Sequence, residues 1–238
     1  MARMQAPDTA SHAASTRRGR FLRGVRLGTP VLLGYIPIGA AFGVLARTAG
    51  MDVVQTIACS MLVFAGSGQF IAVAMMQAGA DAGSILITTG VINLRHILFS
   101  TTLQPYLRHI PLTRQALLAA GITDESFAVN VTDSRGGSAS ASSMAGVQFV
   151  SWSGWVCGTA LGAIATSFIG DPARWGLGFA MAAMFTALLV ATAEDRDHVV
   201  VAVIAVVLAV VFMLVLPGQW SIVATAVTAA AVGAVVFR

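Results

Sequence analysis

Apolar residues dominate the chain in long runs that short polar segments separate. About seven blocks can be marked, at 29–46, 53–77, 84–103, 146–169, 177–193, 198–216 and 220–237. A helix needs roughly 20 apolar residues to cross the hydrocarbon core of a membrane, and the blocks approach or exceed that length. The pattern therefore predicts an all-α polytopic membrane protein with about six to seven transmembrane helices.

The first two blocks contain residues that interrupt helices. Block 29–46 holds Pro37 among several glycines, and proline removes one helical hydrogen bond, so we expect a kink or break there. Block 53–77 is interrupted by Gly66-Ser67-Gly68-Gln69. Irregular backbone at membrane depth is tolerated only where protein covers it or where it lines a wet cavity. We therefore expect discontinuous or re-entrant helices in the N-terminal half, with Gln69 lining a cavity.

The longest polar connector, at about 107–145, divides the chain into two halves. Thr113 and Gly121 are typical of the start and stop of a short helix, and Thr123-Asp124-Glu125-Ser126 of the start of a second. The Gly- and Ser-rich stretch 132–145 has the composition of a flexible linker. The expected organisation is a flexible basic tail over 1–28 and a single transmembrane domain over 29–238, which comprises a motif-bearing half at 29–131, the linker at 132–145 and a scaffold half at 146–238.

The composition agrees with a membrane protein. Hydrophobic residues make up 57% of the chain and charged residues 10%, whereas soluble domains have about 25% charged residues. A disordered chain lacks the apolar residues that are present here. Once the apolar blocks are assigned to spans, no room remains for a soluble catalytic domain.

The positive charge has a topological meaning. The net charge is +4, every basic residue is an arginine, and six of the 14 precede the first block. Such clusters stay on the cytoplasmic side and bind anionic headgroups, so the lipid bilayer explains the charge without any nucleic acid. If all blocks crossed the membrane, one of the later arginines would lie on the cytoplasmic side and six outside. If block 53–77 enters and returns on one side, five lie on the cytoplasmic side and two outside. Because arginines are enriched on the cytoplasmic side, the count favours the re-entrant arrangement.

Residues suited to covalent or metal chemistry are sparse. Cys59 and Cys157 stand alone in separate apolar blocks, and the sequence has no CxxC, HExxH, GxSxG or P-loop motif. We therefore expect no metal, no cofactor, no catalytic residues and no enzymatic activity.

Block 84–103 carries Asn93, Arg95 and His96 within an otherwise apolar span. A charge at the bilayer centre costs at least about 2.5–3.5 kcal/mol, so such residues usually face protein or water and have a function. At about 100° per residue, Asn93 and His96 share a stripe with Ser100 and Gln104, whereas Arg95 points away from it. Both residues also have a purely structural interpretation. Arg95 would then extend to the membrane surface or bind backbone carbonyls, and His96 would be a buried histidine whose hydrogen bonds are satisfied.

Asp124 and Glu125 form an acidic pair directly before apolar residues. One interpretation is that they stabilise the N-terminus of a helix, where negative charge is favourable. The other is that a carboxylate here holds an ammonium group or takes up a proton. Both interpretations stay open at this point.

Four stretches come in an order and spacing that resemble a known family. They are Leu33–Gly43 (LGYIPIGAAFG), Phe64–Phe70 (FAGSGQF), Ile92–His96 (INLRH) and Thr123–Ala128 (TDESFA). Together they resemble the AzlC family of branched-chain amino-acid transporters, the large subunits of LIV-E type exporters. The motifs lie within about 29–131, and the C-terminal half is similar only in length and hydrophobicity.

The resemblance implies export of leucine, isoleucine, valine and often methionine across the bacterial cytoplasmic (inner) membrane, driven by the proton-motive force. It also implies a small membrane partner of the AzlD type. The cytoplasmic N-terminus is predicted by the arginine cluster before the first block. The motif positions that carry over are Pro37, Gly39, Gly66, Gln69, Asn93, Arg95, His96, Asp124 and Glu125.

An amino-acid site needs a positive feature for the carboxylate, an acceptor for the ammonium group and an apolar pocket. Helix ends at breaks near the midplane often provide the first two. We expect substrate binding by Pro37, Gly39, Gly66, Ser67, Gly68, Gln69, Asn93 and Arg95, and proton coupling or gating by His96, Asp124 and Glu125. Arg95 either binds the carboxylate or pairs with Asp124 or Glu125 as a gate. Two other functions compete with transport. One is a non-transporting membrane scaffold, and the other, which the sequence favours less, is an intramembrane enzyme.

Overall fold

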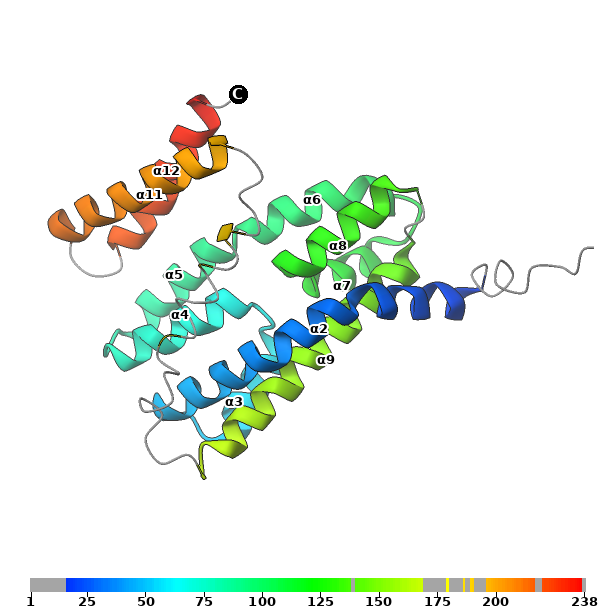
Figure 1. Cartoon of the computed structure of the whole chain (residues 1–238), viewed down its shortest axis with the longest axis horizontal. Helices are drawn as coiled ribbons and strands as arrows, with labels where there is room; N and C mark the ends of the chain where they lie inside the picture. The colour runs from blue at the N-terminus through cyan, green and yellow to red at the C-terminus, as the bar shows by residue number, and fades with distance from the viewer. Residues whose placement is uncertain are drawn as a thin grey trace, which may run out of the picture.

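The computed structural model describes residues 16–137, 140–168, 179, 186, 189–190, 196–216 and 220–236. These residues form helices and no strand, so the prediction of an all-α protein is confirmed (Figure 1). The helices are α2 (Arg17–Thr48), α3 (Val53–Leu62), α4 (Gly66–Gln77), α5 (Ala82–Asn93), α6 (Arg95–Leu107), α7 (Leu112–Ala120), α8 (Asp124–Arg135), α9 (Ala141–Ala165), α11 (Arg196–Val215) and α12 (Trp220–Val236).

Three helical stretches in the described part of the chain are long and apolar enough to cross a membrane. They are α2, the stretch Ala82–Leu107 that contains α5 and α6, and α11. Near the C-terminus, α11 packs against α12, and α12 also contacts α5. The expected block 177–193 lies almost wholly outside the described residues. The number of six to seven spans therefore stays a prediction.

Helices α2 and α9 lie side by side and run in the same direction (Figure 1). Gly24 faces Ser143 near the start of both helices, and Gly162 faces Ala40 near their end. A Cβ atom at Gly24 would lie 1.9 Å from the carbonyl oxygen of Ser143, and one at Gly162 would lie 1.9 Å from that of Ala40. Glycine alone permits backbones to approach this closely. The pair forms the scaffold on which the other helices are arranged.

Block 53–77 folds as a hairpin of two half-helices, α3 and α4. Helix α3 starts directly after α2 ends, and Gln77 at the end of α4 donates from Nε2 to Oγ1 of Thr48 at 3.2 Å. Between the half-helices the chain reverses at Phe64, whose φ of 39° is in the left-handed region. Gly66 then packs against the ring of Trp155 in the middle of α9. The hairpin thus enters from and returns to one end of the α2–α9 pair. The predicted discontinuity of block 53–77 is confirmed, and its re-entrance in the membrane stays a prediction.

Helices α7 and α8 form a second hairpin that enters from the opposite end. Near the end of α8, Asp133 pairs with Arg23 at 2.5 Å and accepts from Ser143 at 3.2 Å, both close to the starts of α2 and α9. Between α7 and α8, Oγ1 of Thr123 lies 2.8 Å from the hydroxyl of Tyr35, in the middle of α2. The tips of the two hairpins therefore meet halfway along the α2–α9 pair.

The predictions for helix boundaries differ from the structure in four places. Helix α2 continues through Pro37 without a break, because α9 packs along its length and offsets the lost hydrogen bond. It begins at Arg17, so residues 17–28 are helical where a flexible tail was expected, and residues 1–15 lie outside the description. The segment between α8 and α9 is shorter than the predicted linker. Block 84–103 is interrupted at Leu94.

Candidate functional site

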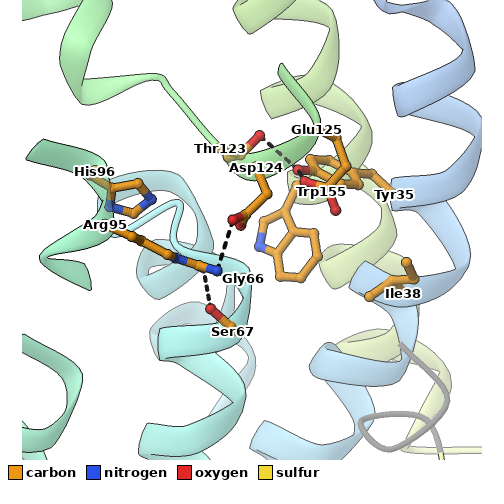
Figure 2. Close-up of a pocket in the computed structure, with 10 residues that line it drawn as sticks. All are labelled: Tyr35, Ile38, Gly66, Ser67, Arg95, His96, Thr123, Asp124, Glu125 and Trp155. Carbon is orange, nitrogen blue, oxygen red and sulfur yellow. Dashed lines mark hydrogen bonds and ion pairs between the residues drawn. The ribbon is translucent and has the colours of Figure 1, made fainter. Parts of the chain in front are cut away.

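A small pocket lies where the two hairpins meet. It is lined by Tyr35, Ile38, Gly66, Ser67, Arg95, His96, Thr123, Asp124, Glu125 and Trp155 (Figure 2). These residues come from α2, α4, α6, the start of α8 and α9, so the pocket gathers segments that are far apart in the sequence. The space open to the centre of a water molecule is about 20 Å³, which accommodates about one water. In this state the pocket is closed to any larger ligand.

Arg95 occupies the centre of the pocket and joins three elements. Its Nη1 lies 2.8 Å from Oδ1 of Asp124, and its Nη2 donates to Oγ of Ser67 (Figure 2). The side chain is 25% exposed and that of Asp124 is 24% exposed, so the pair is partly desolvated. Nε of Arg95 is buried and has no hydrogen-bond partner among the described residues. The guanidinium thus keeps a donor available beside the cavity.

Glu125 lies on the other side of the pocket and has a different partner. The hydroxyl of Tyr35, a side chain that is 5% exposed, donates to Oε2 of Glu125. Thr123 holds the same hydroxyl from the other side. Within the described part of the chain Glu125 makes no ion pair, in contrast to Asp124. The two neighbouring carboxylates therefore have distinct environments, one cationic and one phenolic.

The two half-helices that start at the pocket have opposite electrostatic character. The N-terminus of α4 begins with Gly66 and Ser67, which line the pocket, and it has no side-chain cap, so its positive end meets no anionic side chain of its own cap. The N-terminus of α8 is closed by a capping box of Thr123 and Ser126, and its first turn carries Asp124 and Glu125. The pocket therefore presents a positive wall from α4 and Arg95, and a negative wall from α8.

Two predicted ligand residues support the pocket without lining it. Gln69 is 2% exposed; its Oε1 accepts from Nε1 of Trp155 at 3.0 Å, and its Nε2 donates to Ser60 at 3.1 Å. Asn93 packs against Gly68, where a Cβ atom would lie 3.0 Å from the Asn93 amide nitrogen. Gln69 therefore fixes the tip of the first hairpin to α9 and does not face the cavity, contrary to expectation.

Pro37 and Gly39 are also absent from the lining. A Cβ atom at Gly39 would lie 2.7 Å from the carbonyl oxygen of Trp155, so this glycine is required by the α2–α9 contact. Because α2 is continuous at Pro37, this segment offers no free helix N-terminus. The expected break at Pro37 is therefore wrong, and a role of Pro37 and Gly39 in substrate binding stays a prediction.

The predicted orientation of Arg95 relative to His96 is also wrong. The 100° rule requires one uninterrupted helix, but α5 ends at Asn93 and α6 starts at Arg95. The interruption lets Arg95 and His96 face the same pocket (Figure 2). Gln104, which was expected on the polar stripe, instead accepts from Arg108 at 3.4 Å on the exposed surface.

Four lining residues were not predicted as site residues: Tyr35, Ile38, Thr123 and Trp155. Tyr35 and Ile38 are one helical turn apart within the first quoted motif, and Thr123 opens the fourth, so motif membership could have found them. Trp155 carries no local signal, because only the packing of α9 against α2 brings it there. In the residues that the structure describes, no group of three or more His, Cys, Asp or Glu side chains is placed to hold a metal ion.

The family model described as AzlC protein matches residues 30–169. The chain is 32% identical over 189 residues to the inner membrane protein YgaZ of Escherichia coli K12, covering 76% of each chain. It is 34% identical over 190 residues to a membrane protein of Archaeoglobus fulgidus, covering 79% of this chain and 82% of the relative.

A more distant relative carries a functional name. The chain is 26% identical over 162 residues to the branched-chain amino acid transport protein AzlC of Bacillus subtilis 168, covering 68% of this chain and 63% of that protein. No solved structure matches significantly. The family match includes both hairpins and all of the pocket-lining residues.

Proposed function

The chain belongs to the AzlC family, and on that basis we propose that it is the large subunit of a secondary active transporter that exports branched-chain amino acids. The substrates are leucine, isoleucine and valine, with methionine as a further substrate. Export proceeds across the bacterial cytoplasmic membrane, is driven by the proton-motive force and requires a small AzlD-type membrane subunit. The observation that carries this proposal is the pocket with one positive and one negative wall between two opposed hairpins.

The pocket is complementary to the two charges of an amino acid. Arg95 and the open N-terminus of α4 offer donors to the carboxylate, and Asp124 offers an acceptor to the ammonium group. Without substrate, Arg95 and Asp124 satisfy each other, which avoids leaving a partly buried charge unpaired. A bound amino acid supplies both counter-charges and replaces this internal pair. The charge in the pocket is then conserved between the empty and loaded states.

The apolar lining supports a preference for aliphatic side chains. Ile38 and the ring of Trp155 border the pocket beside the charged groups (Figure 2). An apolar pocket separates substrates that differ by one methylene by only about 1–3 kcal/mol. Acceptance of several aliphatic amino acids by one site therefore follows.

Transport requires the hairpins to separate. A cavity of about 20 Å³ is far too small for leucine, so the structure corresponds to a closed state. Movement of one hairpin away from the other would open the pocket toward one end of the α2–α9 pair, and movement of the opposite hairpin would open it toward the other. Substitution of the Arg95–Asp124 pair by substrate provides the switch between these states.

Proton coupling is assigned to the groups at the edge of the pocket. Asp124 forms an ion pair with Arg95, whereas Glu125 accepts a hydrogen bond from the hydroxyl of Tyr35. His96 lies beside the guanidinium group of Arg95. Glu125 and His96 can therefore change protonation without breaking the central ion pair.

The experiment is efflux of leucine from cells loaded with leucine-containing dipeptides, with and without a co-encoded small membrane subunit. Arg95→Gln is compared with Arg108→Gln, an exposed arginine outside the pocket, at matched abundance in the membrane. The proposal predicts fast efflux that needs the partner, is lost in Arg95→Gln and persists in Arg108→Gln. Unchanged efflux in Arg95→Gln would instead favour a non-transporting scaffold role for this chain.

A further inference from the structure

A second and much larger cavity lies at the end of the molecule where α2 and α9 begin. It is a groove of about 930 Å³ between the start of α2, the connector from α6 to α7, α7 itself and the start of α9 (Figure 1 shows these segments at one end). The central pocket lies half the length of the α2–α9 pair away, so the groove is a separate feature. The proposed amino-acid site does not use any residue of this groove.

The groove is strongly basic. Arg17, Arg18 and Arg20 line it from α2, and Arg114 lines it from α7, while the lining contains no Asp or Glu. Arg17, Arg18 and Arg114 are exposed and form no ion pair within the described ranges. Guanidinium groups form paired hydrogen bonds with phosphate oxygens, and several of them around one space make a strong anion site.

The same groove has an apolar wall. Phe21 and Leu117 line it, and Leu117 is 75% exposed. A soluble anion such as inorganic phosphate would contact only the arginines. An amphiphile with an anionic head and a hydrocarbon chain would contact both the arginines and the apolar wall. The position of the groove also fits a lipid, because arginine clusters that flank membrane spans lie at the cytoplasmic leaflet, next to anionic headgroups.

We propose that this groove binds an anionic phospholipid, with its phosphate among Arg17, Arg18 and Arg114 and its acyl chain along Phe21 and Leu117. The lipid then bridges α2 and α7. Helix α7 is the first arm of the second hairpin, whose tip carries Asp124. Bound lipid therefore ties the entry of this hairpin to the rigid α2–α9 pair.

The test uses the full chain, purified in a neutral detergent, with phosphatidylglycerol as the probe and phosphatidylcholine as the uncharged comparison. Thermal unfolding is followed while lipid is titrated, and native mass spectrometry counts retained lipid molecules. The triple variant R17Q/R18Q/R114Q is compared with R26Q/R108Q/R135Q, which removes the same charge from exposed arginines outside the lining. Inorganic phosphate at millimolar concentration forms a further arm.

The expected result is saturable stabilisation by phosphatidylglycerol only. Each arginine near an anionic headgroup contributes about fivefold in affinity, so the groove variant should bind about 100-fold more weakly, and the control variant within a few-fold of the parent. Equal stabilisation by inorganic phosphate would overturn the lipid proposal in favour of a free-anion site. Equal lipid affinity in both triple variants would overturn it as well. If the groove variant does not unfold cooperatively, the test rests on native mass spectrometry of the parent chain. A parent chain that does not retain phosphatidylglycerol saturably would then refute the proposal.

Discussion

Replacing Asp124 by Asn removes the negative wall of the pocket while it keeps the shape of the side chain. The carboxylate of Asp124 receives Nη1 of Arg95 at 2.8 Å and is the proposed acceptor for the substrate ammonium group. A hydrogen bond between charged groups contributes about 1.5–3 kcal/mol. Because both side chains are about one quarter exposed, the lower half of that range applies, about 1.5–2 kcal/mol. Leucine affinity should therefore fall by about 10- to 30-fold.

The assay is counterflow of labelled leucine in proteoliposomes that contain the complex with the small subunit. Inhibition by leucine is compared with inhibition by 4-methylpentanoate, which has the same carbon skeleton without the amino group. The Asp124→Asn variant should lose affinity for leucine but none for 4-methylpentanoate, because that ligand has no ammonium group to lose a partner and no longer leaves the Asp124 charge unpaired. The control is Asp81→Asn, an exposed helix cap far along the chain from the pocket residues of α8.

Two outcomes would refute the reasoning. If Asp124→Asn weakens both ligands equally, Asp124 acts through the fold of the hairpin and does not contact the ammonium group. If leucine affinity stays unchanged while the protein remains folded, the negative wall has no part in recognition.

Two further predictions concern the scaffold and its topology. Gly162→Ala should destabilise the protein by about 1–3 kcal/mol in thermal unfolding, because its Cβ atom would lie 1.9 Å from a backbone oxygen of α2. The control Gly34→Ala should be neutral or stabilising, since its Cβ atom would have no neighbour within 4 Å. Equal effects of the two substitutions would contradict the close α2–α9 contact. After Cys59 and Cys157 are replaced, single cysteines from Ala49→Cys and Ala78→Cys should react with an impermeant thiol reagent from one side of the membrane. A cysteine from Arg114→Cys should react from the other side. Labelling of Ala49→Cys and Ala78→Cys from opposite sides would rule out the first re-entrant hairpin.

Part of the fold is legible in the sequence because local chemistry determines it. The Gly-Ser-Gly-Gln interruption predicts that block 53–77 is divided into two helices, and the structure contains α3 and α4 there. The start of α8 is equally local, since Thr123 and Ser126 form a capping box that the motif contains. These features depend on residues that are neighbours in the chain.

Other parts depend on tertiary contacts that no local pattern records. Pro37 predicts a break, yet α2 continues there because α9 supports it. The sequence predicts two short helices in the polar connector but not that α7 and α8 form a hairpin, because the tip of this hairpin is stabilised by Tyr35 of α2. Trp155 reaches the pocket only through the parallel packing of α9. For the same reason Gln69 was predicted to line the cavity, whereas its amide is used by Trp155.

The central claim is that this pocket binds a complete zwitterionic aliphatic amino acid. The most direct measurement is equilibrium binding of labelled leucine to the purified complex with the small subunit, in competition with valine and with leucinamide, which lacks the carboxylate. The account predicts saturable binding at one site per large subunit, displacement by valine and no displacement by leucinamide. Absence of saturable binding in a folded complex, or equal displacement by leucinamide, would contradict it.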